Sequence, residues 1–176
     1  MLMKDEIRKH MKALRRNLTQ EEIAQSAKEV TEAITKTDAY AIAKTVCLYL
    51  SAYKEVDTSA LLAKCKKDNK IVLLPVTATD GTITLYRDNG KYKKGNFNIT
   101  EPDSDETADA KTVDLFIIPA LAFDKNGNRL GFGMGCYDRL LKDSNGYKIG
   151  IGYAFQLLES LPCDAHDIKM DMVICK

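Results

Sequence analysis

A series of short apolar runs, separated by polar or amphipathic segments, is the feature that most constrains the fold of this chain. The runs cover residues 45–50, 71–74, 113–118, 147–153 and 172–175, and they are rich in Val, Ile, Leu and Tyr. Apolar runs of this length are typical of strands buried on both faces of a parallel sheet. Because helical segments alternate with them, they predict an α/β fold with a mostly parallel central sheet.

Helices are expected before and between these runs. Residues 4–16 repeat apolar side chains at helical spacing, and Thr19 with Glu22 forms a capping box that starts a second helix ending near Lys36. A further helix is expected over 57–68. We expect the polar face of the first helix to be solvated surface. That face carries Lys4, Arg8, Lys9, Lys12, Arg15 and Arg16.

The sequence between the second and third apolar runs is less regular. Pro75 is expected to stop the strand over 71–74, and a short strand is expected over 82–86. Residues 87–112 are polar and contain Gly90, Gly95 and Pro102, so they are interpreted as a long connection. A connection of this length in a small domain is usually functional or mobile.

Length and composition limit the class of protein. The 176 residues predict a single domain over 1–176, with 45% hydrophobic and 29% charged residues and a net charge of +1. This balance gives no reason to expect nucleic acid or a membrane as a partner. The five cysteines are scattered and odd in number, which argues against a disulfide framework or a zinc site. The N-terminus lacks the apolar segment of a signal peptide, so a cytoplasmic location is expected.

The stretch from Arg129 to Leu141 carries the strongest chemical pattern. Gly131, Gly133 and Gly135 alternate with larger residues, and Asp138 follows at the start of an expected helix. The pattern matches neither the Walker loop nor the dinucleotide fingerprint, and the stretch does not follow an expected strand directly. Two interpretations remain open, a tight turn and a loop whose N–H groups cradle phosphate.

The expected sheet suggests where this stretch lies. Ligands of open α/β sheets bind beyond the carboxyl ends of the strands. The glycine-rich stretch lies on the connection after the strand over 113–118, and residues 52–57 follow the strand over 45–50. We therefore expect both segments at the same rim of the sheet.

Residues 118–138 resemble the signature of the 5-formyltetrahydrofolate cyclo-ligase family, also called 5,10-methenyltetrahydrofolate synthetases. The shared features are Pro119, the pair Phe123-Asp124, the triplet Arg129-Leu130-Gly131, the alternating glycines and the pair Tyr137-Asp138. Lys4, Arg8, Glu55 and the segment 166–171 follow the family order across the chain. The resemblance implies a three-layer α/β/α fold with N-terminal helices, like the sugar-phosphate isomerase and CoA-transferase-like sheets.

The resemblance also implies an activity. Members of the family convert 5-formyltetrahydrofolate to 5,10-methenyltetrahydrofolate, with ATP as co-substrate and Mg²⁺ as cofactor. The partners would then be small molecules, and we expect a monomer.

Site residues carry over from the family position by position. The implied ATP contacts are Lys4, Arg8, Arg129, Gly131, Gly133, Met134, Gly135, Cys136 and Tyr137. Two of these depart from the family pattern. Met134 stands where many members carry Lys, and Cys136 stands where Tyr is common, so one phosphate contact is expected to be missing or supplied elsewhere. We interpret Cys136 as a change of pocket shape and not as a nucleophile.

The implied folate contacts are Leu50, Glu55, Phe97, Phe132 and Tyr137. A carboxylate such as Glu55 suits the paired N–H donors of a pterin. Tyr137 is expected either near the formyl group or in packing at the helix start.

The implied metal ligands are Asp138 and Asp167, and assistance from the nearby Asp171 is left open. Mg²⁺ bridging phosphates needs only one or two protein carboxylates. Arg129, Tyr137 and Asp138 are the expected catalytic residues. His166 is expected to hydrogen-bond a carboxylate.

Two other classes of function stay open at this point. One is a nucleotide-binding paralogue without catalytic activity, and the other is a different enzyme on a similar sheet, such as a sugar-phosphate isomerase. Intact Glu55, Arg129 and Asp138 favour the cyclo-ligase over the paralogue.

Overall fold

The computed structural model describes residues 3–95 and 98–176. A seven-stranded sheet, in the order β12-β10-β7-β1-β2-β3-β6, forms its centre. These strands are β1 (Thr45–Cys47), β2 (Ile71–Thr77), β3 (Ile83–Arg87), β6 (Thr107–Ala108), β7 (Leu115–Pro119), β10 (Tyr147–Gly152) and β12 (Met172–Cys175). The strands from β12 to β2 run parallel, and β3 and β6 add an antiparallel edge. The mostly parallel α/β sheet expected from the sequence is therefore confirmed.

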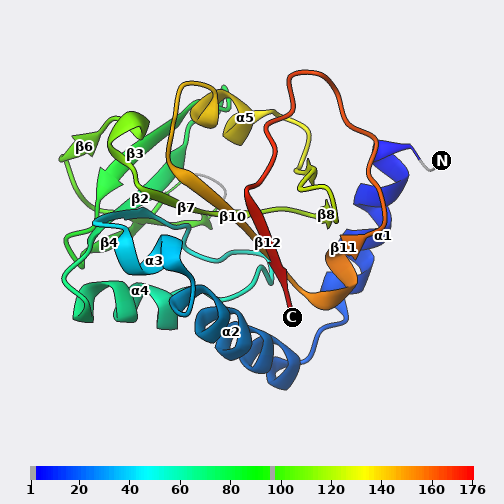
Figure 1. The fold of residues 1–176 in the computed structure, drawn as a ribbon, viewed down its shortest axis with the longest axis horizontal. Coiled ribbons are helices and arrows are strands. Elements are labelled where there is room, and N and C mark those ends of the chain that lie inside the picture. Colours follow the sequence, from blue (N-terminus) through cyan, green and yellow to red (C-terminus); the bar gives the residue numbers. More distant parts are fainter. Residues whose placement is uncertain (1–2, 96–97) are drawn as a thin grey trace.

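The helices cover the sheet unequally. They are α1 (Lys4–Arg16), α2 (Gln20–Thr35), α3 (Asp38–Ile42), α4 (Ser59–Lys67) and α5 (Cys136–Leu141). Figure 1 shows α2, α3 and α4 on one face of the sheet and α5 on the other. Among the described residues, no helix is long and apolar enough to cross a membrane.

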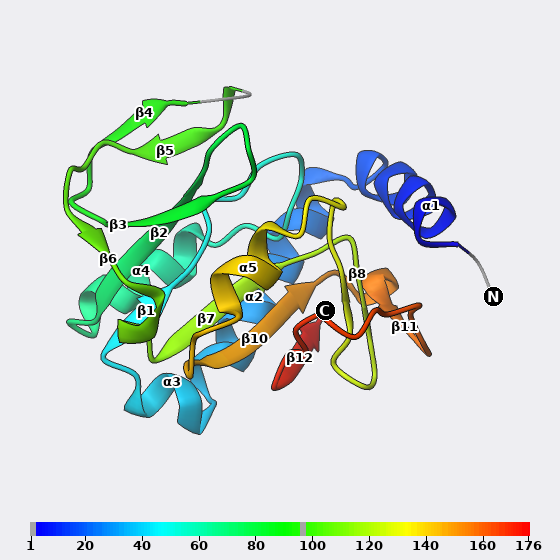
Figure 2. The same cartoon turned by 90° about the horizontal axis from the view of Figure 1, so that it is seen from above.

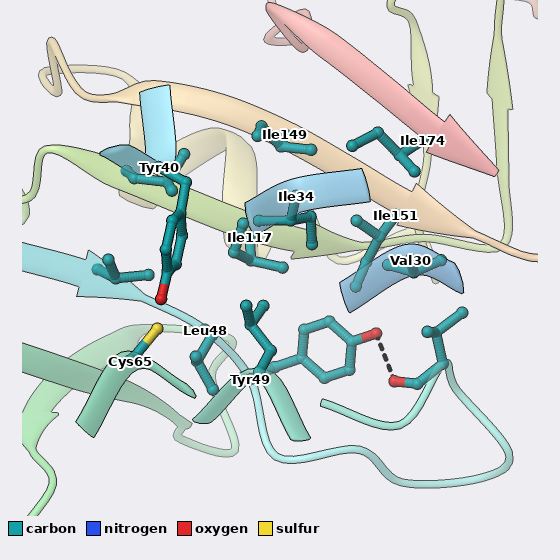
Figure 3. Packing of buried hydrophobic residues seen from close by; sticks show 14 of the residues in the cluster. Val30, Ile34, Tyr40, Leu48, Tyr49, Cys65, Ile117, Ile149, Ile151 and Ile174 are labelled. Atoms are coloured by element: carbon teal, nitrogen blue, oxygen red, sulfur yellow. Dashed lines mark hydrogen bonds between the residues drawn. The ribbon is translucent and has the colours of Figure 1, made fainter. Parts of the chain in front are cut away.

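Successive side chains of the strands point to opposite faces of the sheet, and both faces are buried. Val46, Leu48 and Ile117 point toward α2–α4 and pack with Val30, Ile34 and other side chains of that layer (Figure 3). Their sequence neighbours, including Cys47 and Phe116, face the opposite side and pack against α5. A period of two thus buries both faces, which explains why the strands appear as nearly continuous apolar runs.

Two smaller sheets complete the fold. One has the order β11-β8-β9, formed by Leu157–Leu158, Ala122–Asp124 and Arg129–Leu130. Ile7 and Met11 of α1 pack on this sheet through Leu121 and Leu130. The other is a hairpin of β4 (Tyr92–Lys94) and β5 (Thr100–Pro102). Figure 2 shows this hairpin at one end of the molecule and α1 at the other.

Several local expectations are corrected. Pro75 does not stop β2, because β1 pairs with β2 only as far as Leu73 and the proline lies where the strand has β3 as its remaining partner. Residues 87–112 are not a structureless connection, since they contain β4, β5, β6 and a 3-10 turn at Ala110–Thr112. Strand β9 leads directly into Gly131, although no strand was expected there.

The N-terminal expectations fare better. Helix α1 has the predicted bounds, and the Thr19–Glu22 capping box is present, with Thr19 Oγ1 accepting from the Glu22 N–H at 3.2 Å and Glu22 Oε2 accepting from the Thr19 N–H at 2.8 Å. The resemblance assigns Lys4 and Arg8 to ATP, and of the other basic residues on this face Lys9, Lys12 and Arg16 are exposed, as expected, but Arg15 is not. Arg15 is buried with Ile7 and Met11, whose spacing it shares.

Asp124 is a fully buried carboxylate at the end of β8. It accepts hydrogen bonds from the backbone N–H groups of Asn126, Asn128 and Leu161 and from Asn128 Nδ2, at 2.8 to 3.0 Å. Burial alone raises the pKa of Asp124, but the donors outweigh it and hold the pKa below its ordinary value of 3.8. Asp124 therefore fastens the turn that precedes Arg129 to the C-terminal segment at Leu161.

We predict that Asp124→Ala lowers the free energy of unfolding by about 3 kcal/mol, because several buried N–H groups lose their acceptor. The pKa of Asp124 is lower in the folded protein than its ordinary value of 3.8. The stabilisation from the ionised carboxylate is therefore complete above pH 3.8 and is lost as the pH falls through the lower, folded-state pKa. Urea unfolding of wild type and variant between pH 7 and pH 3 measures both effects.

The control is Asp105→Ala, which removes an exposed carboxylate. We expect it to change stability by less than about 0.5 kcal/mol. Equal stability of Asp124→Ala and Asp105→Ala would contradict the role given to Asp124.

Candidate active site

A cavity of about 570 Å³ lies at the carboxyl ends of β1, β2 and β7. Leu50, Thr77 and Pro119 mark those strand ends in its wall. The wall also includes Lys4 and Arg8 of α1, the segment around Glu55, residues 99–101 of the hairpin, residues 129–138, and Asp164, His166 and Asp167. The common rim expected for residues 52–57 and the glycine-rich stretch is confirmed.

The glycine loop, residues 131–135, joins β9 to α5. Gly133 and Gly135 have φ angles of 108° and 63°, which favour glycine. A Cβ atom at Gly131 would lie 3.0 Å from Arg129 Nη1, and one at Gly133 would lie 3.4 Å from Arg8 Cζ. The missing side chains thus let two guanidinium groups lie against the loop. Arg8 also donates from Nε to the Gly131 carbonyl at 3.0 Å.

Arg129 is held in the cavity wall by an ion pair. Its Nη2 lies 3.0 Å from Asp138 Oδ2, and its side chain is only 6% exposed. The Tyr137 ring lies beneath the guanidinium, with 5.4 Å between Arg129 Cζ and the ring centroid. Arg129 Nε is buried without a hydrogen-bond partner in the described structure. A buried donor of this kind is costly unless a ligand or water accepts from it.

The second acidic group of the site comes from the C-terminal segment. Lys4 Nζ lies 2.6 Å from Asp164 Oδ2 and 3.0 Å from Asp167 Oδ2. The ligand atoms of Asp164, His166 and Asp167 lie within 4.8 Å of one another. Burial raises the pKa of Asp167, but the Asp164 N–H and Lys4 outweigh it and lower the pKa overall. Asp167 is therefore a carboxylate at neutral pH.

Asp138 and Asp167 both line the cavity, whereas Asp171 does not. Asp138 Oδ1 accepts from the Ile168 N–H at 3.1 Å, which ties α5 to the segment that carries Asp167. Asp171 instead accepts from the Lys148 N–H at 2.7 Å, in the main sheet. The oxygen donors of Asp138 and Asp167 suit a hard cation such as Mg²⁺, while Asp171 is engaged elsewhere.

Glu55 projects into the cavity from the loop after β1. Its Oε2 accepts from the Ala52 N–H at 3.0 Å. Burial raises its pKa, and the Ala52 N–H and the charge of Arg15 act in the opposite direction. Tyr49 lies near Glu55, and Leu50, Pro75 and Pro119 add apolar surface to the cavity wall at the strand ends.

The other predicted contacts have different surroundings. Phe132, Met134, Cys136 and Tyr137 all line the cavity, and Phe132 and Met134 are half exposed. Burial raises the pKa of Tyr137 well above its ordinary value, so its hydroxyl stays protonated. Phe97 lies outside the described residues.

Sequence reasoning missed several lining residues. Tyr49 lies next to Leu50 at a strand end, and Asp164 lies in the same segment as Asp167, so position along the chain could have identified both. Glu101 comes from β5 of the hairpin, and no sequence pattern indicated that this strand reaches the cavity.

The whole chain matches a known protein family. The family model described as the 5-formyltetrahydrofolate cyclo-ligase family matches residues 1–176. The 5-formyltetrahydrofolate cyclo-ligase of Haemophilus influenzae is 31% identical, with 95% of this chain and 94% of that protein covered.

Two solved structures share the fold. The NMR structure of 5,10-methenyltetrahydrofolate synthetase from Aquifex aeolicus has a TM-score of 0.87 and 37% identity, covering 99% of this chain and 90% of that one. The 5,10-methenyltetrahydrofolate synthetase from Mycoplasma pneumoniae has a TM-score of 0.80 and 25% identity, covering 98% of each chain. With a family model matched along its whole length, the chain belongs to the 5-formyltetrahydrofolate cyclo-ligase family.

Proposed function

We propose that this cyclo-ligase converts 5-formyltetrahydrofolate to 5,10-methenyltetrahydrofolate with Mg²⁺ and ATP, releasing ADP and phosphate. The observation that carries the proposal is one cavity with two chemically different parts. The guanidinium groups of Arg8 and Arg129 lie against the glycine loop, whereas Glu55 comes from the loop after β1, where the wall also has apolar residues of the strand ends.

The cationic part suits the phosphates of ATP. Lys4, Arg8 and Arg129 line it together with Gly131, Gly133 and Gly135. Arg129 has an unpartnered buried Nε, which a phosphate oxygen could accept from. Met134 and Cys136 belong to the same wall, and neither adds a positive charge.

The apolar part suits the pterin ring. Glu55 offers two acceptor oxygens to the paired N–H donors of the ring. Leu50 and Tyr49 line the same cavity and would contact the ring through their side chains. Phe132 and Tyr137 lie in residues 129–138, which also border the phosphate part. Tyr137 keeps its proton and can donate a hydrogen bond to the formyl group.

Asp138 and Asp167 would hold the magnesium ion, with waters and phosphate oxygens as its other ligands. When bound, the ion supplies charge neutralisation for the phosphates. The same carboxylates form ion pairs with Arg129 and Lys4. The cations and the acids of the site thus neutralise one another.

The reaction needs alignment more than covalent chemistry from the protein. The formyl carbon is a poor electrophile because the N5 lone pair is delocalised into its carbonyl group. Transfer of the γ-phosphoryl group to the formyl oxygen breaks the bond to the bridging oxygen and releases ADP. N10 then attacks the formyl carbon, loses its proton and closes a five-membered ring as phosphate leaves. Arg129 and Lys4 would stabilise the transferred charge, and Glu55 would orient the acceptor.

A spectroscopic assay tests the proposal directly. The methenyl product absorbs in the near ultraviolet, where the formyl substrate does not. Mixing the protein with Mg²⁺, ATP and 5-formyltetrahydrofolate should produce this chromophore, and omitting ATP or Mg²⁺ should abolish it. A folded protein that gives no chromophore with any nucleotide and divalent metal would overturn the assignment.

We predict that Asp138→Asn lowers kcat on the order of 100-fold, because the cavity loses a charge that positions Mg²⁺ and Arg129. The amide oxygen can still accept from the Ile168 N–H, so the fold should persist. Initial rates against Mg²⁺ concentration measure the effect. Asp143→Asn, which changes an exposed acid just after α5, is the control. Near-wild-type turnover with unchanged Mg²⁺ dependence would show that Asp138 is not a metal ligand.

We predict that Met134→Lys lowers the KM for ATP by about three- to tenfold, because a partly exposed charge on the glycine loop gains a phosphate contact. Met134 is 53% exposed, so a lysine fits without repacking. The KM for folate should not change. Leu157→Lys adds the same charge at β11, away from the cavity, and should leave both constants alone. If both lysines act alike, the effect is not a local contact.

A further inference from the structure

Arg15 is a buried charge near the end of α1. Only 4% of the residue is exposed, although Lys12 and Arg16 on the same helix are exposed. Arginine is rarely buried to this extent without a partner, because its charge must be desolvated. Within the described part of the chain, no carboxylate forms an ion pair with it under 4.0 Å. The packing of α1 therefore does not by itself explain an arginine at this position.

The guanidinium contacts the loop that carries Glu55. Arg15 Nη2 donates to the Tyr53 carbonyl at 2.9 Å. The positive charge of Arg15 also acts on the partly buried Glu55 carboxylate, two residues after Tyr53. Arg15 is thus linked to Glu55 both through the loop backbone and through space.

The same loop has a strained backbone. Tyr53 and Lys54 are consecutive non-glycine residues with φ angles of 50° and 57°. A non-glycine residue in this region is strained and persists only where surrounding contacts hold it. Strain of this kind is common at ligand-binding sites.

The contacts that hold the loop come from two sides. Lys54 Nζ donates to the carbonyls of Arg16 and Leu18, at 2.8 Å each, and so fastens the loop to the junction of α1 and α2. The Tyr153 hydroxyl lies 3.1 Å from the carbonyls of Lys54 and Glu55, on the side of β10. Arg15, through its hydrogen bond to the Tyr53 carbonyl, is a third contact of this loop, and its charge is buried.

We propose that Arg15 is a positioning residue for 5-formyltetrahydrofolate binding, which holds the Tyr53 carbonyl and so fixes the loop that presents Glu55 to the pterin. This rests on the folate-binding role proposed for Glu55. Arg15 lines no part of the cavity and acts only through Glu55 and its loop.

The electrostatics around Glu55 fix the sign of the effect. Burial raises the pKa of Glu55, while the Ala52 N–H and Arg15 lower it. Its other titratable neighbours are Tyr49, Tyr137 and Tyr153, whose own pKa values are raised by burial, so they stay neutral near pH 7. Removing the Arg15 charge raises the pKa of Glu55 further, and folate binding is then lost at a higher pH as the solution is acidified.

The main variants separate charge from hydrogen bonding. Arg15→Gln keeps an N–H donor for the Tyr53 carbonyl but removes the charge, and Arg15→Lys keeps the charge. We expect Arg15→Gln to weaken 5-formyltetrahydrofolate binding on the order of tenfold, with the KM for ATP unchanged. The acid limb of kcat/KM for folate should move to higher pH. Arg15→Lys should retain most of the affinity and the wild-type limb.

The matched control is Arg16→Gln, the exposed neighbour on the same helix. Its carbonyl, and not its side chain, accepts from Lys54, so the control leaves the loop contacts in place. We expect its folate affinity and pH profile to equal those of wild type. Thermal unfolding of each variant shows whether it remains folded.

A double-mutant cycle with Glu55→Gln tests the role of Arg15 separately from the folate-binding role of Glu55. The readout is calorimetric binding of 5-formyltetrahydrofolate. If Arg15 acts through Glu55, adding Arg15→Gln to Glu55→Gln should cost no further affinity. Additive losses, or an unshifted acid limb in Arg15→Gln, would overturn the role of Arg15. If Glu55→Gln binds folate like wild type, the proposed role of Glu55 fails first. If Arg15→Gln does not fold, Arg15→Lys provides the test. Folate affinity and an acid limb like those of wild type in Arg15→Lys would support a role for the charge, and loss of either would overturn it.

Discussion

The buried carboxylate of Asp124 is the interaction on which the rest of the site depends. Its two oxygens gather N–H groups from the turn before β9 and from Leu161, so one side chain fixes the starts of two separate segments. The same turn is closed from the other side, because the Met170 N–H donates to the Gly127 carbonyl at 2.8 Å. One segment then delivers Arg129 and the glycine loop, and the other delivers Asp164 and Asp167. A loss of Asp124 would release both walls of the cationic part of the cavity together.

The charged groups around the glycine loop form ion pairs. Arg129 pairs with Asp138, Lys4 pairs with Asp164 and Asp167, and Arg8 pairs with Asp5. Binding of an anion with a divalent cation can therefore exchange partners instead of desolvating isolated charges. The exposed pairs, with Asp5 and Asp164, contribute little net stability because water and salt screen them, and the buried Arg129–Asp138 pair contributes little because desolvation offsets its attraction. The pairs are thus better understood as preorganisation of the site than as support for the fold.

The sequence was most informative where one physical rule dominates. The continuous apolar runs and the capping box at Thr19 predicted the main sheet and the second helix, and residues 118–138 indicated the family. It was least informative where tertiary contacts decide. Pro75 continues β2 because a neighbouring strand ends, the β4–β5 hairpin forms within a polar segment, and Arg15 was assigned to a solvated face. The spacing of Arg15 with Ile7 and Met11 was a signal for burial, but its charge outweighed that pattern in the interpretation.

Helix α1 serves both parts of the cavity, which explains why its charged residues have such different surroundings. Lys4, Arg8 and Arg15 recur at helical intervals of four and seven, so they share one side of the helix with Ile7 and Met11. A rise of 1.5 Å per residue separates Lys4 from Arg15 by roughly 16 Å along the axis. The first turns therefore reach the cationic part of the cavity, and the last turn reaches the loop of Glu55. Because Ile7 and Met11 fix the helix on β8 and β9, a shift of α1 would misplace contacts to both proposed substrates at once.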